Sequence, residues 1–261
     1  MKKIIISLLL TFVVSFAVNA GTDGENSLSK KKSSQVKDCF EGLNRATFAF
    51  NLGLDRILFE PIAKGYRKLP TPIKKGASNV VTNLSSLVTI PNNFLQGNFA
   101  LGGTNVARFG INTTAGILGI FDVASEIGFS EYEKEDYGQT LGVMGVKPGC
   151  YLVLPVLGPS TARDSVGIAA SMLGGDPWYN ITVRNNTEHF EDSDYYITRA
   201  TSGTDFRAKN IDSFDNLEKN SMDFYASVRS LYLQDRKQKI SNSTKVTNTQ
   251  DDSDWEEIET K

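Results

Sequence analysis

Residues 92–129 restrict the possible folds of this chain most, because large apolar side chains and glycines are interleaved throughout them. Seven glycines lie in this stretch, and Arg108, Asn112 and Asp122 interrupt its apolar runs. No run is long and uncharged enough to cross a bilayer, which takes about 20 apolar residues in a helix. Glycines permit close helix packing or a sharp hairpin. The stretch therefore predicts either a buried helix pair in an ordinary core or an amphipathic hairpin that lies in lipid or lines a lipid path.

Helical periodicity dominates the rest of the chain and predicts an all-α fold with little or no strand. A first helix is expected to begin at Asp38, because Asp38 and Glu41 have the spacing of a capping box. A second begins at Thr71-Pro72, and we expect it to end before Pro91. An apolar run at 151–157, broken by a proline, is at best an edge strand. Further helical patterns lie at residues 161–172, 184–201 and 207–240.

Composition excludes several classes of protein. The 261 residues carry a formal net charge of -2, whereas a general nucleic-acid binder usually shows a basic stripe. The single histidine, His189, excludes a metal site with two imidazoles, and two cysteines exclude a four-cysteine zinc site. No phosphate-binding glycine motif is present, so no cofactor is expected.

The first twenty residues have the pattern of a secretory signal. Lys2 and Lys3 precede an apolar run that ends at Val18-Asn19-Ala20, a pattern suited to cleavage before Gly21. The alternative is an uncleaved membrane anchor, for which the run is short. We therefore divide the chain into a signal peptide (1–20), a flexible leader (21–37), a helical domain (38–240) and a disordered acidic tail (241–261).

Export would place Cys39 and Cys150 in an oxidising compartment, where disulfides form. Closing a loop of that length is worth about 4–5 kcal/mol in the chain-entropy model. The alternative is two separate small buried thiols. Both readings stay open, because the sequence does not give the distance between the two Cα atoms.

Gly158-Pro159-Ser160-Thr161-Ala162 is the nearest approach to a catalytic motif. It resembles a nucleophile elbow, and Asp164 or Asp176 followed by His189 would complete the residue order of a hydrolase. The final glycine of the elbow, an oxyanion loop and an alternating βα pattern are all missing. The alternative is a Gly-Pro turn in which Ser160 or Thr161 caps a helix. The residues favour an exported, mostly helical protein that is not an enzyme.

Four segments in order carry a family resemblance. They are Phe40–Asn51 (FEGLNRATFAFN), Pro91–Gly97 (PNNFLQG), Ala107–Gly119 (ARFGINTTAGILG) and Glu135–Asp164. Together they cover about residues 38–235. The chain resembles the MlaA (VacJ) family of Gram-negative outer-membrane phospholipid-transport proteins.

The resemblance implies a ring-shaped helical domain that lies in the inner leaflet of the outer membrane around an amphipathic channel. It implies passive removal of glycerophospholipid from the outer leaflet. A soluble periplasmic carrier of the Mla pathway would receive the lipid and deliver it to an inner-membrane ABC complex, and an outer-membrane porin trimer would be a partner. The rival functions are a lipase or acyltransferase that uses Ser160, and a structural envelope protein that binds lipid without moving it.

The resemblance also leads to site expectations. We expect the lipid path to include Gly116, Ile117, Leu118, Gly119, Ile120, Phe121, Asp122 and Gly128. In it the apolar side chains would face acyl chains, Asp122 would face headgroups and the glycines would provide flexibility. The alternative is that these residues only pack the ring. Membrane contact is expected at Phe94, Leu95 and Phe99. A carrier could dock on Asp251, Asp252, Asp254, Trp255, Glu256 and Glu257.

Two departures from the family pattern matter. Members usually carry a lipobox cysteine after the signal, whereas this chain has Val18-Asn19-Ala20-Gly21, so a lipid anchor is not expected. Cys39 and Cys150 stand where the family motifs usually have other residues. A disulfide joining the first helix to the segment near residue 150 is thus a hypothesis specific to this chain.

Overall fold

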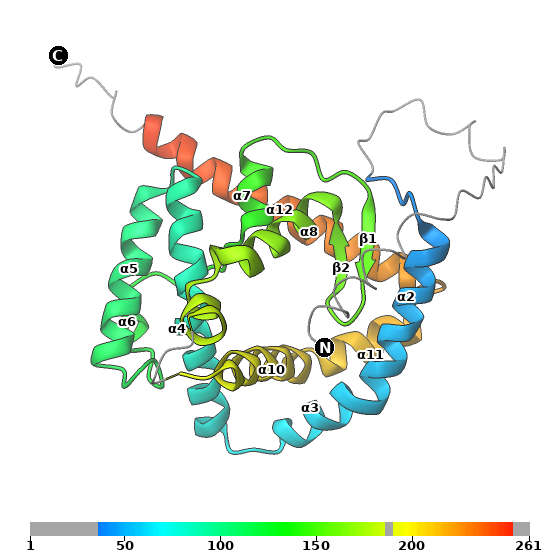
Figure 1. Cartoon of the computed structure of the whole chain (residues 1–261), viewed down its shortest axis with the longest axis horizontal. Coiled ribbons are helices and arrows are strands. Elements are labelled where there is room, and N and C mark those ends of the chain that lie inside the picture. The colour runs from blue at the N-terminus through cyan, green and yellow to red at the C-terminus, as the bar shows by residue number, and fades with distance from the viewer. Residues whose placement is uncertain (1–35, 186–189, 253–261) are drawn as a thin grey trace, which may run out of the picture. The chain divides into compact units, whose positions relative to one another are not determined.

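The computed structural model describes residues 36–185 and 190–252, with side chains up to residue 241 (Figure 1). The expected signal peptide and most of the leader lie outside the described residues. Helices dominate the fold, and a two-stranded hairpin is the sheet found in the described residues, so the all-α expectation is confirmed. No described helix is both long enough and apolar enough to span a bilayer.

The elements follow one another in this order: α2 (Glu41–Leu54), the π-helical η1 (Asp55–Phe59), α3 (Glu60–Arg67), α4 (Thr71–Leu95), α5 (Phe99–Thr114), α6 (Val123–Glu126), α7 (Tyr137–Val143), β1 (Tyr151–Leu154), β2 (Gly158–Thr161), α8 (Ala162–Ala170), η2 (Ser171–Gly175), α9 (Pro177–Tyr179), η3 (Asn180–Arg184), α10 (Asp192–Lys209), α11 (Ile211–Asn220) and α12 (Phe224–Asp252).

Within residues 36–252 these elements contact one another in a closed circuit (Figure 1). Helix α2 continues through η1 into α3, α3 packs on α10, and α10 packs on α4. Helix α4 then contacts α7, α7 packs on α8, and α8 contacts β2, whose partner strand β1 contacts α2 again. Helix α5 pairs with α4, and α12 packs on α7 and β2. The circuit is the ring expected from the family resemblance.

Side-chain caps explain where many of these helices begin. An oxygen of Asn98, Asp122, Asp136, Thr161 or Asp176 accepts a hydrogen bond from a backbone N–H in the first turn of α5, α6, α7, α8 or α9. Such a cap stabilises a helix by about 1 kcal/mol. Thr161 therefore has the capping role considered for the Gly-Pro turn.

The first helix differs from its expected start. Helix α2 begins at Glu41, and Asp38 makes no capping box. Its carboxylate instead accepts hydrogen bonds from Asn44 Nδ2 (2.7 Å) and from the hydroxyl of Tyr225. Long-range bonds thus replace the local cap that the spacing predicts.

Helix α4 also departs from expectation, because it continues through Pro91 to Leu95. A proline inside a helix costs about 3 kcal/mol. The turn that follows it is held by other elements. Thr140 Oγ1 donates to Asn92 Oδ1 (2.6 Å), and Asn105 Nδ2 donates to Asn93 Oδ1 (2.8 Å), with all four residues buried. These buried bonds hold the last turn of α4 helical.

The hairpin of β1 and β2 is pinned to the start of the domain. Tyr151 N donates to Lys37 O (2.8 Å), and Asn44 bonds both Tyr151 O (3.0 Å) and Val153 N (2.9 Å). Cys39 and Cys150 form a disulfide, with their Cα atoms 5.6 Å apart. The N-terminal segment is therefore joined covalently and by hydrogen bonds to a segment 111 residues later.

The C-terminal boundary differs too. Helix α12 runs to Asp252, whereas a disordered tail is expected from residue 241. Once the packed part of α12 is formed, each further residue adds one backbone hydrogen bond without a new nucleus, so the helix extends into the polar sequence. Asp251 and Asp252 fall at its end, and the other expected docking residues, Asp254, Trp255, Glu256 and Glu257, lie outside the described residues.

Candidate lipid-facing surface and polar interior

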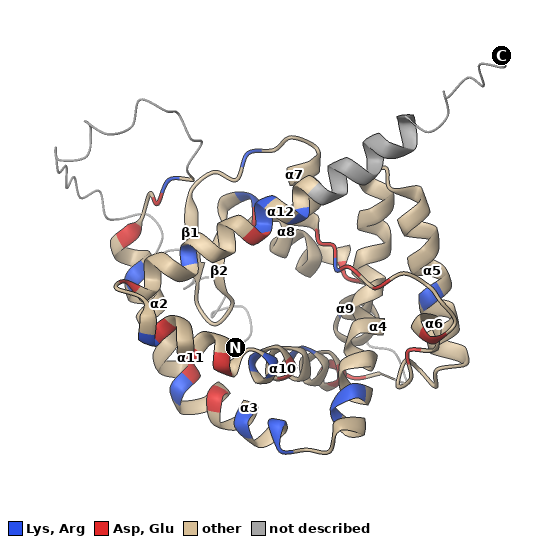
Figure 2. Ribbon diagram, turned by 180° about the vertical axis from the view of Figure 1, so that it is seen from behind, with Lys and Arg blue, Asp and Glu red and all other residues tan. Residues whose placement is uncertain are grey.

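The distribution of side chains is inverted relative to a water-soluble domain. Of the residues that the structure describes, 22 buried side chains are polar or charged and eight are hydrophobic, whereas 31 large hydrophobic side chains are exposed. Charged residues lie along α2, α3, α10, α11 and α12, whereas α4 beyond its first turns and most of α5 carry none (Figure 2). Extensive exposed apolar surface marks contact with lipid or with another protein.

Residues 115–122, which we call the glycine loop, join α5 to α6 and carry most of the predicted lipid path. Backbone bonds fix its course: Leu118 N donates to Thr113 O (2.9 Å) and Gly119 N donates to Asn112 O (2.8 Å). Ile117 and Leu118 have φ values of 53° and 55°, a left-handed conformation that is unusual for bulky residues. Their side chains are 59% and 70% exposed. The loop thus exposes two apolar side chains, although the left-handed backbone conformation of these residues costs free energy.

The glycines of this loop serve close packing. A Cβ on Gly119 would lie 2.6 Å from the Cβ of Asn83, and one on Gly116 would lie 2.2 Å from the carbonyl oxygen of Phe121. Gly119 also has a φ of 91°. Gly128 has a φ of 99°, but a Cβ there would meet no atom within 4 Å. Gly116 and Gly119 therefore let the loop approach α4 and α5.

We expect Gly119→Ala to lower the free energy of unfolding by more than 1 kcal/mol, because it adds a steric clash and a strained φ. Thermal unfolding in detergent would measure this. Gly103→Ala is the matched control, since its Cβ meets nothing within 4 Å in helix α5. Equal melting temperatures for the two variants would contradict the packing role of Gly119.

A polar pocket lies behind the glycine loop. Arg108 donates to both carboxylate oxygens of Asp122 (2.9 and 3.0 Å), and Asn112 Nδ2 donates to the same carboxylate (2.8 Å). Burial favours the neutral acid, but hydrogen bonds from Ser125 and Asn112 and the charge of Arg108 outweigh it, so the pKa of Asp122 lies below its usual value. The pocket is lined by Asn79, Thr82, Asn83, Ser86, Arg108, Asn112, Asp122 and Tyr132.

The Asp122 carboxylate is thus bound within the protein, while 34% of its side chain stays exposed. That it faces lipid headgroups stays a prediction. Its carboxylate also caps α6. The buried Oδ1 of Asn83 has no hydrogen-bond partner among the described residues, and Asn83 Nδ2 donates to Thr113 (2.9 Å). Burial raises the pKa of Tyr132 to about 12, so its hydroxyl stays protonated at neutral pH. The pocket is a neutral, hydrogen-bonding space apart from one internal ion pair.

The predicted membrane-contact residues lie where α4 ends and α5 begins. Phe94, Leu95 and Phe99 are all exposed. The rings of Phe94 and Phe99 lie 6.0 Å apart. Gly102 lies against the Phe94 ring, because a Cβ there would be 2.9 Å from it. The structure therefore brings Phe94 and Phe99 together where α4 meets α5, and Leu95 is exposed at the end of α4.

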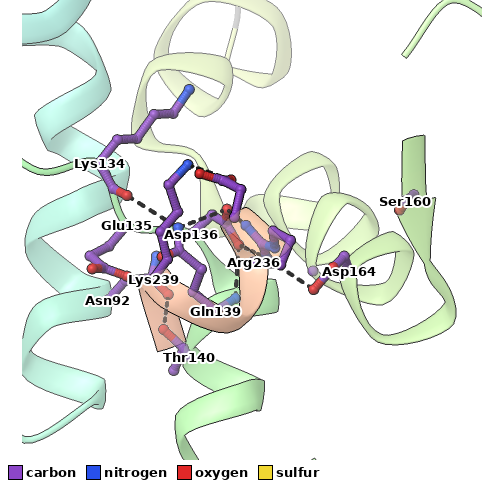
Figure 3. A network of polar contacts seen from close by, with 12 residues as sticks. Asn92, Lys134, Glu135, Asp136, Gln139, Thr140, Ser160, Asp164, Arg236 and Lys239 are labelled. Carbon is purple, nitrogen blue, oxygen red and sulfur yellow. Dashed lines mark hydrogen bonds and ion pairs between the residues drawn. The ribbon is translucent and has the colours of Figure 1, made fainter. Parts of the chain in front are cut away.

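A second polar network joins α4, α7, α8 and α12 (Figure 3). Arg236 donates to Asp136 through both terminal nitrogens (2.7 and 3.0 Å) and to Asp164 (2.9 Å). Tyr232 donates to the other oxygen of Asp164 (2.6 Å). The guanidinium of Arg236 is 11% exposed and the carboxylate of Asp164 5%. One cation on α12 therefore serves two carboxylates from two helices.

The titration of this network follows from its bonds. Burial opposes ionisation of Asp136, but the hydrogen bonds and charge of Arg236 prevail and lower its pKa to about 2. Burial and the neighbouring Asp164 raise the pKa of Tyr232. At neutral pH the network holds two carboxylates, two arginines, since Arg163 also pairs with Asp164 (2.8 Å), and a protonated Tyr232.

The residues considered for hydrolysis are placed differently from a catalytic triad. Ser160 is 1% exposed, and its hydroxyl lies 3.0 Å from the hydroxyl of Ser165. Asp164 is bound by Arg236, and Asp176 caps α9 and accepts from Arg199. His189 lies outside the described residues. Among the described residues, no group of three or more His, Cys, Asp or Glu side chains could hold a metal ion.

Sequence reasoning missed the residues that hold the ring together. Asn44 and Asn51 bind the β-hairpin, and Arg236 binds α12 to α7 and α8. Asn51 Nδ2 donates to Leu154 O (2.9 Å) and its Oδ1 accepts from Val156 N (2.8 Å). Asn44 and Asn51 are seven residues apart on one face of α2. That spacing was the available signal, since polar side chains stand inside an otherwise apolar helix.

Comparison with known proteins places the chain in a family. The family model described as MlaA lipoprotein matches residues 36–239. The Escherichia coli intermembrane phospholipid transport system lipoprotein MlaA is 33% identical over 208 residues, 76% of each chain. An uncharacterized protein of Rickettsia prowazekii is 37% identical over 197 residues, 75% of each chain.

A solved structure gives the same result. A chain from work on the structural basis for maintenance of bacterial outer membrane lipid asymmetry aligns with a TM-score of 0.67 and 32% identity. The alignment covers 78% of this chain and 99% of that one. Sequence motifs, helical circuit and matched length agree, and the chain belongs to the MlaA lipoprotein family.

Proposed function

We propose that this protein is a passive conduit for glycerophospholipid, lying in the inner leaflet of the outer membrane and maintaining the lipid asymmetry of that membrane. It takes phospholipid from the outer leaflet and passes it to a soluble periplasmic carrier. The observation that carries this proposal is the inverted distribution of side chains in a closed circuit of helices, with large apolar side chains exposed and polar ones buried.

Both halves of that distribution match a phospholipid environment. Apolar side chains outside lose no hydration when acyl chains surround them, and amphipathic helices can lie in a leaflet without crossing it. Every backbone polar group in lipid needs a partner within the protein, which helices provide. The buried polar side chains find hydrogen-bond partners inside the protein, where hydrocarbon would supply none. No nucleotide-binding motif is present in the sequence, so the conduit works without its own energy source.

The names of the relatives support a place in a phospholipid transport pathway. Proteins named as components of an intermembrane phospholipid transport system are 29% to 33% identical to this chain. The proposal therefore includes a carrier of the Mla pathway, an inner-membrane ABC complex beyond it and an outer-membrane porin trimer beside the ring. Attachment without a lipobox cysteine rests on the exposed apolar surface and on the porin.

The hydrolase alternative is not favoured by the geometry. A nucleophilic serine must reach a substrate carbonyl, but Ser160 is a buried residue of strand β2, and its hydroxyl is bonded to that of Ser165. Its carboxylate candidates already bind arginines. Conduit activity accordingly needs no catalytic residue.

The test is outer-leaflet phospholipid in cells that lack this protein, complemented with the wild type or Ser160→Ala. We expect phospholipid to accumulate in the outer leaflet without the protein and to return to the wild-type level with either version. Rescue by the wild type alone would support the hydrolase. No accumulation at all would overturn the conduit.

A second assay separates a conduit from a protein that only binds lipid. Purified protein in vesicles is mixed with the soluble carrier, and labelled phospholipid on the carrier is measured over time. A conduit speeds transfer catalytically, so one protein delivers many lipids. Transfer that stops at one lipid for each protein would indicate binding without transport.

A further inference from the structure

The loop between α3 and α4 combines apolar and basic side chains at an exposed corner. Lys68 ends α3, residues 69–73 form the turn and the first residues of α4, and Lys75 follows. We call residues 68–75 the basic corner. Leu69 and Ile73 are 40% and 55% exposed, and Figure 2 shows basic residues on both sides of this loop.

The corner is rigid, because several bonds and two prolines fix it. Lys74 Nζ donates to Arg67 O (3.0 Å), which closes the end of α3. The hydroxyl of Tyr66 reaches Lys74 O (3.3 Å) and Asp205 (3.2 Å), and its ring packs on the cluster of Ala63, Ala208 and Ile211. Pro70 and Pro72 restrict the backbone further. A preformed loop loses little conformational entropy when it binds a surface.

The side chains of two lysines at this corner have no partner among the described residues. The neighbouring basic residues are bound: Lys64 to Glu60, Arg67 to Asp212 and Lys209 to Asp205. Lys68 and Lys75 are exposed, and no described residue forms a hydrogen bond or ion pair with their side chains. The corner therefore presents the exposed ammonium groups of Lys68 and Lys75 beside two apolar side chains, and Lys74, which donates to a backbone carbonyl, adds a third positive charge.

We propose that the basic corner binds the anionic headgroups of a phospholipid surface, with Lys68 and Lys75 at the phosphates and Leu69 and Ile73 among the acyl chains. Lysine suits this position, because its apolar stem lies along hydrocarbon while its ammonium group stays at the interface. An acidic protein surface would satisfy the charges but would not explain the exposed apolar side chains between them. The inference rests on the proposed function for its membrane location and adds a preference for anionic lipid.

The test is the partition of purified protein onto vesicles of phosphatidylcholine alone or with phosphatidylglycerol. The variant is Lys68→Gln/Lys75→Gln, which removes the charges but keeps polar side chains of similar length. Each lysine near an anionic surface contributes about 1 kcal/mol, so the preference for phosphatidylglycerol vesicles should fall about 30-fold. Rising salt should weaken the wild-type preference in the same direction.

The matched control is Lys219→Gln/Lys237→Gln, which removes two exposed lysines from α11 and α12. This control should keep the wild-type preference, and all variants should share one melting temperature. Wild-type protein that does not prefer phosphatidylglycerol, or equal losses in both double variants, would overturn the proposal.

Transport separates this inference from the proposed function. Transfer of labelled phosphatidylcholine from purely zwitterionic vesicles should be the same for wild type and Lys68→Gln/Lys75→Gln. Absence of transfer by the wild type overturns the conduit, whereas intact transfer without an anionic preference overturns only the basic corner.

Discussion

Replacing Cys39 and Cys150 together with alanine is expected to lower the free energy of unfolding by about 4–5 kcal/mol in the chain-entropy model. The disulfide spans 111 residues, so the unfolded chain gains a large conformational freedom when it is lost. It also lies beside the hydrogen bonds that join Lys37 and Asn44 to β1. Denaturant unfolding of both proteins in the same detergent measures the difference.

Non-reducing peptide mapping of the exported protein is the first control, because it shows whether the two cysteines are joined. A reducing agent should shift the unfolding midpoint of the wild type and leave that of the double variant unchanged. Two free thiols in the mapped wild type, or equal midpoints for both proteins, would contradict this prediction.

Replacing Arg236 with glutamine should destabilise the protein by about 3 kcal/mol at neutral pH, the lower end of the range for breaking a buried ion pair. The buried Asp164 loses one of its two arginines, and Asp136, whose side chain is 38% exposed, loses its cation. Asp164 keeps only Arg163 and Tyr232, and Asp136 keeps Gln139. Urea unfolding in detergent at pH 7 measures the loss. Lys237→Gln is the control on the same helix, and an exposed substitution of this kind changes stability by less than about 0.5 kcal/mol.

The pH dependence gives this prediction a second readout. The pKa of Asp136 in the folded protein is about 2, below its ordinary value of 3.8. Its contribution to stability is therefore present above pH 4 and is lost as the pH falls towards 2. Arg236→Gln should remove much of this acid-sensitive contribution, so the two proteins should approach equal stability near pH 2. A constant difference at all pH values would contradict the role of the ion pair.

Local patterns were sufficient for much of the fold. Helical periodicity and caps gave the all-α class, and Thr161 caps α8 as the Gly-Pro turn suggested. Helix starts and ends failed where a distant partner outweighed a local preference. Asp38 bonds Asn44 and Tyr225 instead of capping α2, and Asn92 and Asn93 hold α4 helical past Pro91.

The site was harder to predict, because residue type alone does not say which side of a ring a side chain faces. The apolar residues of the glycine loop and Phe94, Leu95 and Phe99 are exposed, in keeping with lipid contact. A carboxylate can accept hydrogen bonds from a lipid headgroup, but the Asp122 carboxylate already forms an ion pair with Arg108. The sequence does not distinguish Lys68 and Lys75 from the other lysines. Only the structure shows that the neighbouring basic residues Lys64, Arg67 and Lys209 are paired with carboxylates.

The inverted distribution of side chains also affects how stability changes with temperature. Unfolding of an ordinary domain raises the heat capacity by about 12–15 cal/mol/K per residue, chiefly by wetting apolar surface. Here much of the apolar surface already lies outside and few apolar side chains are buried. Unfolding within a lipid or detergent phase wets little new hydrocarbon, so the heat-capacity increment is small. The stability curve is correspondingly flat, and cooling weakens the fold less than it weakens a domain with a hydrophobic core.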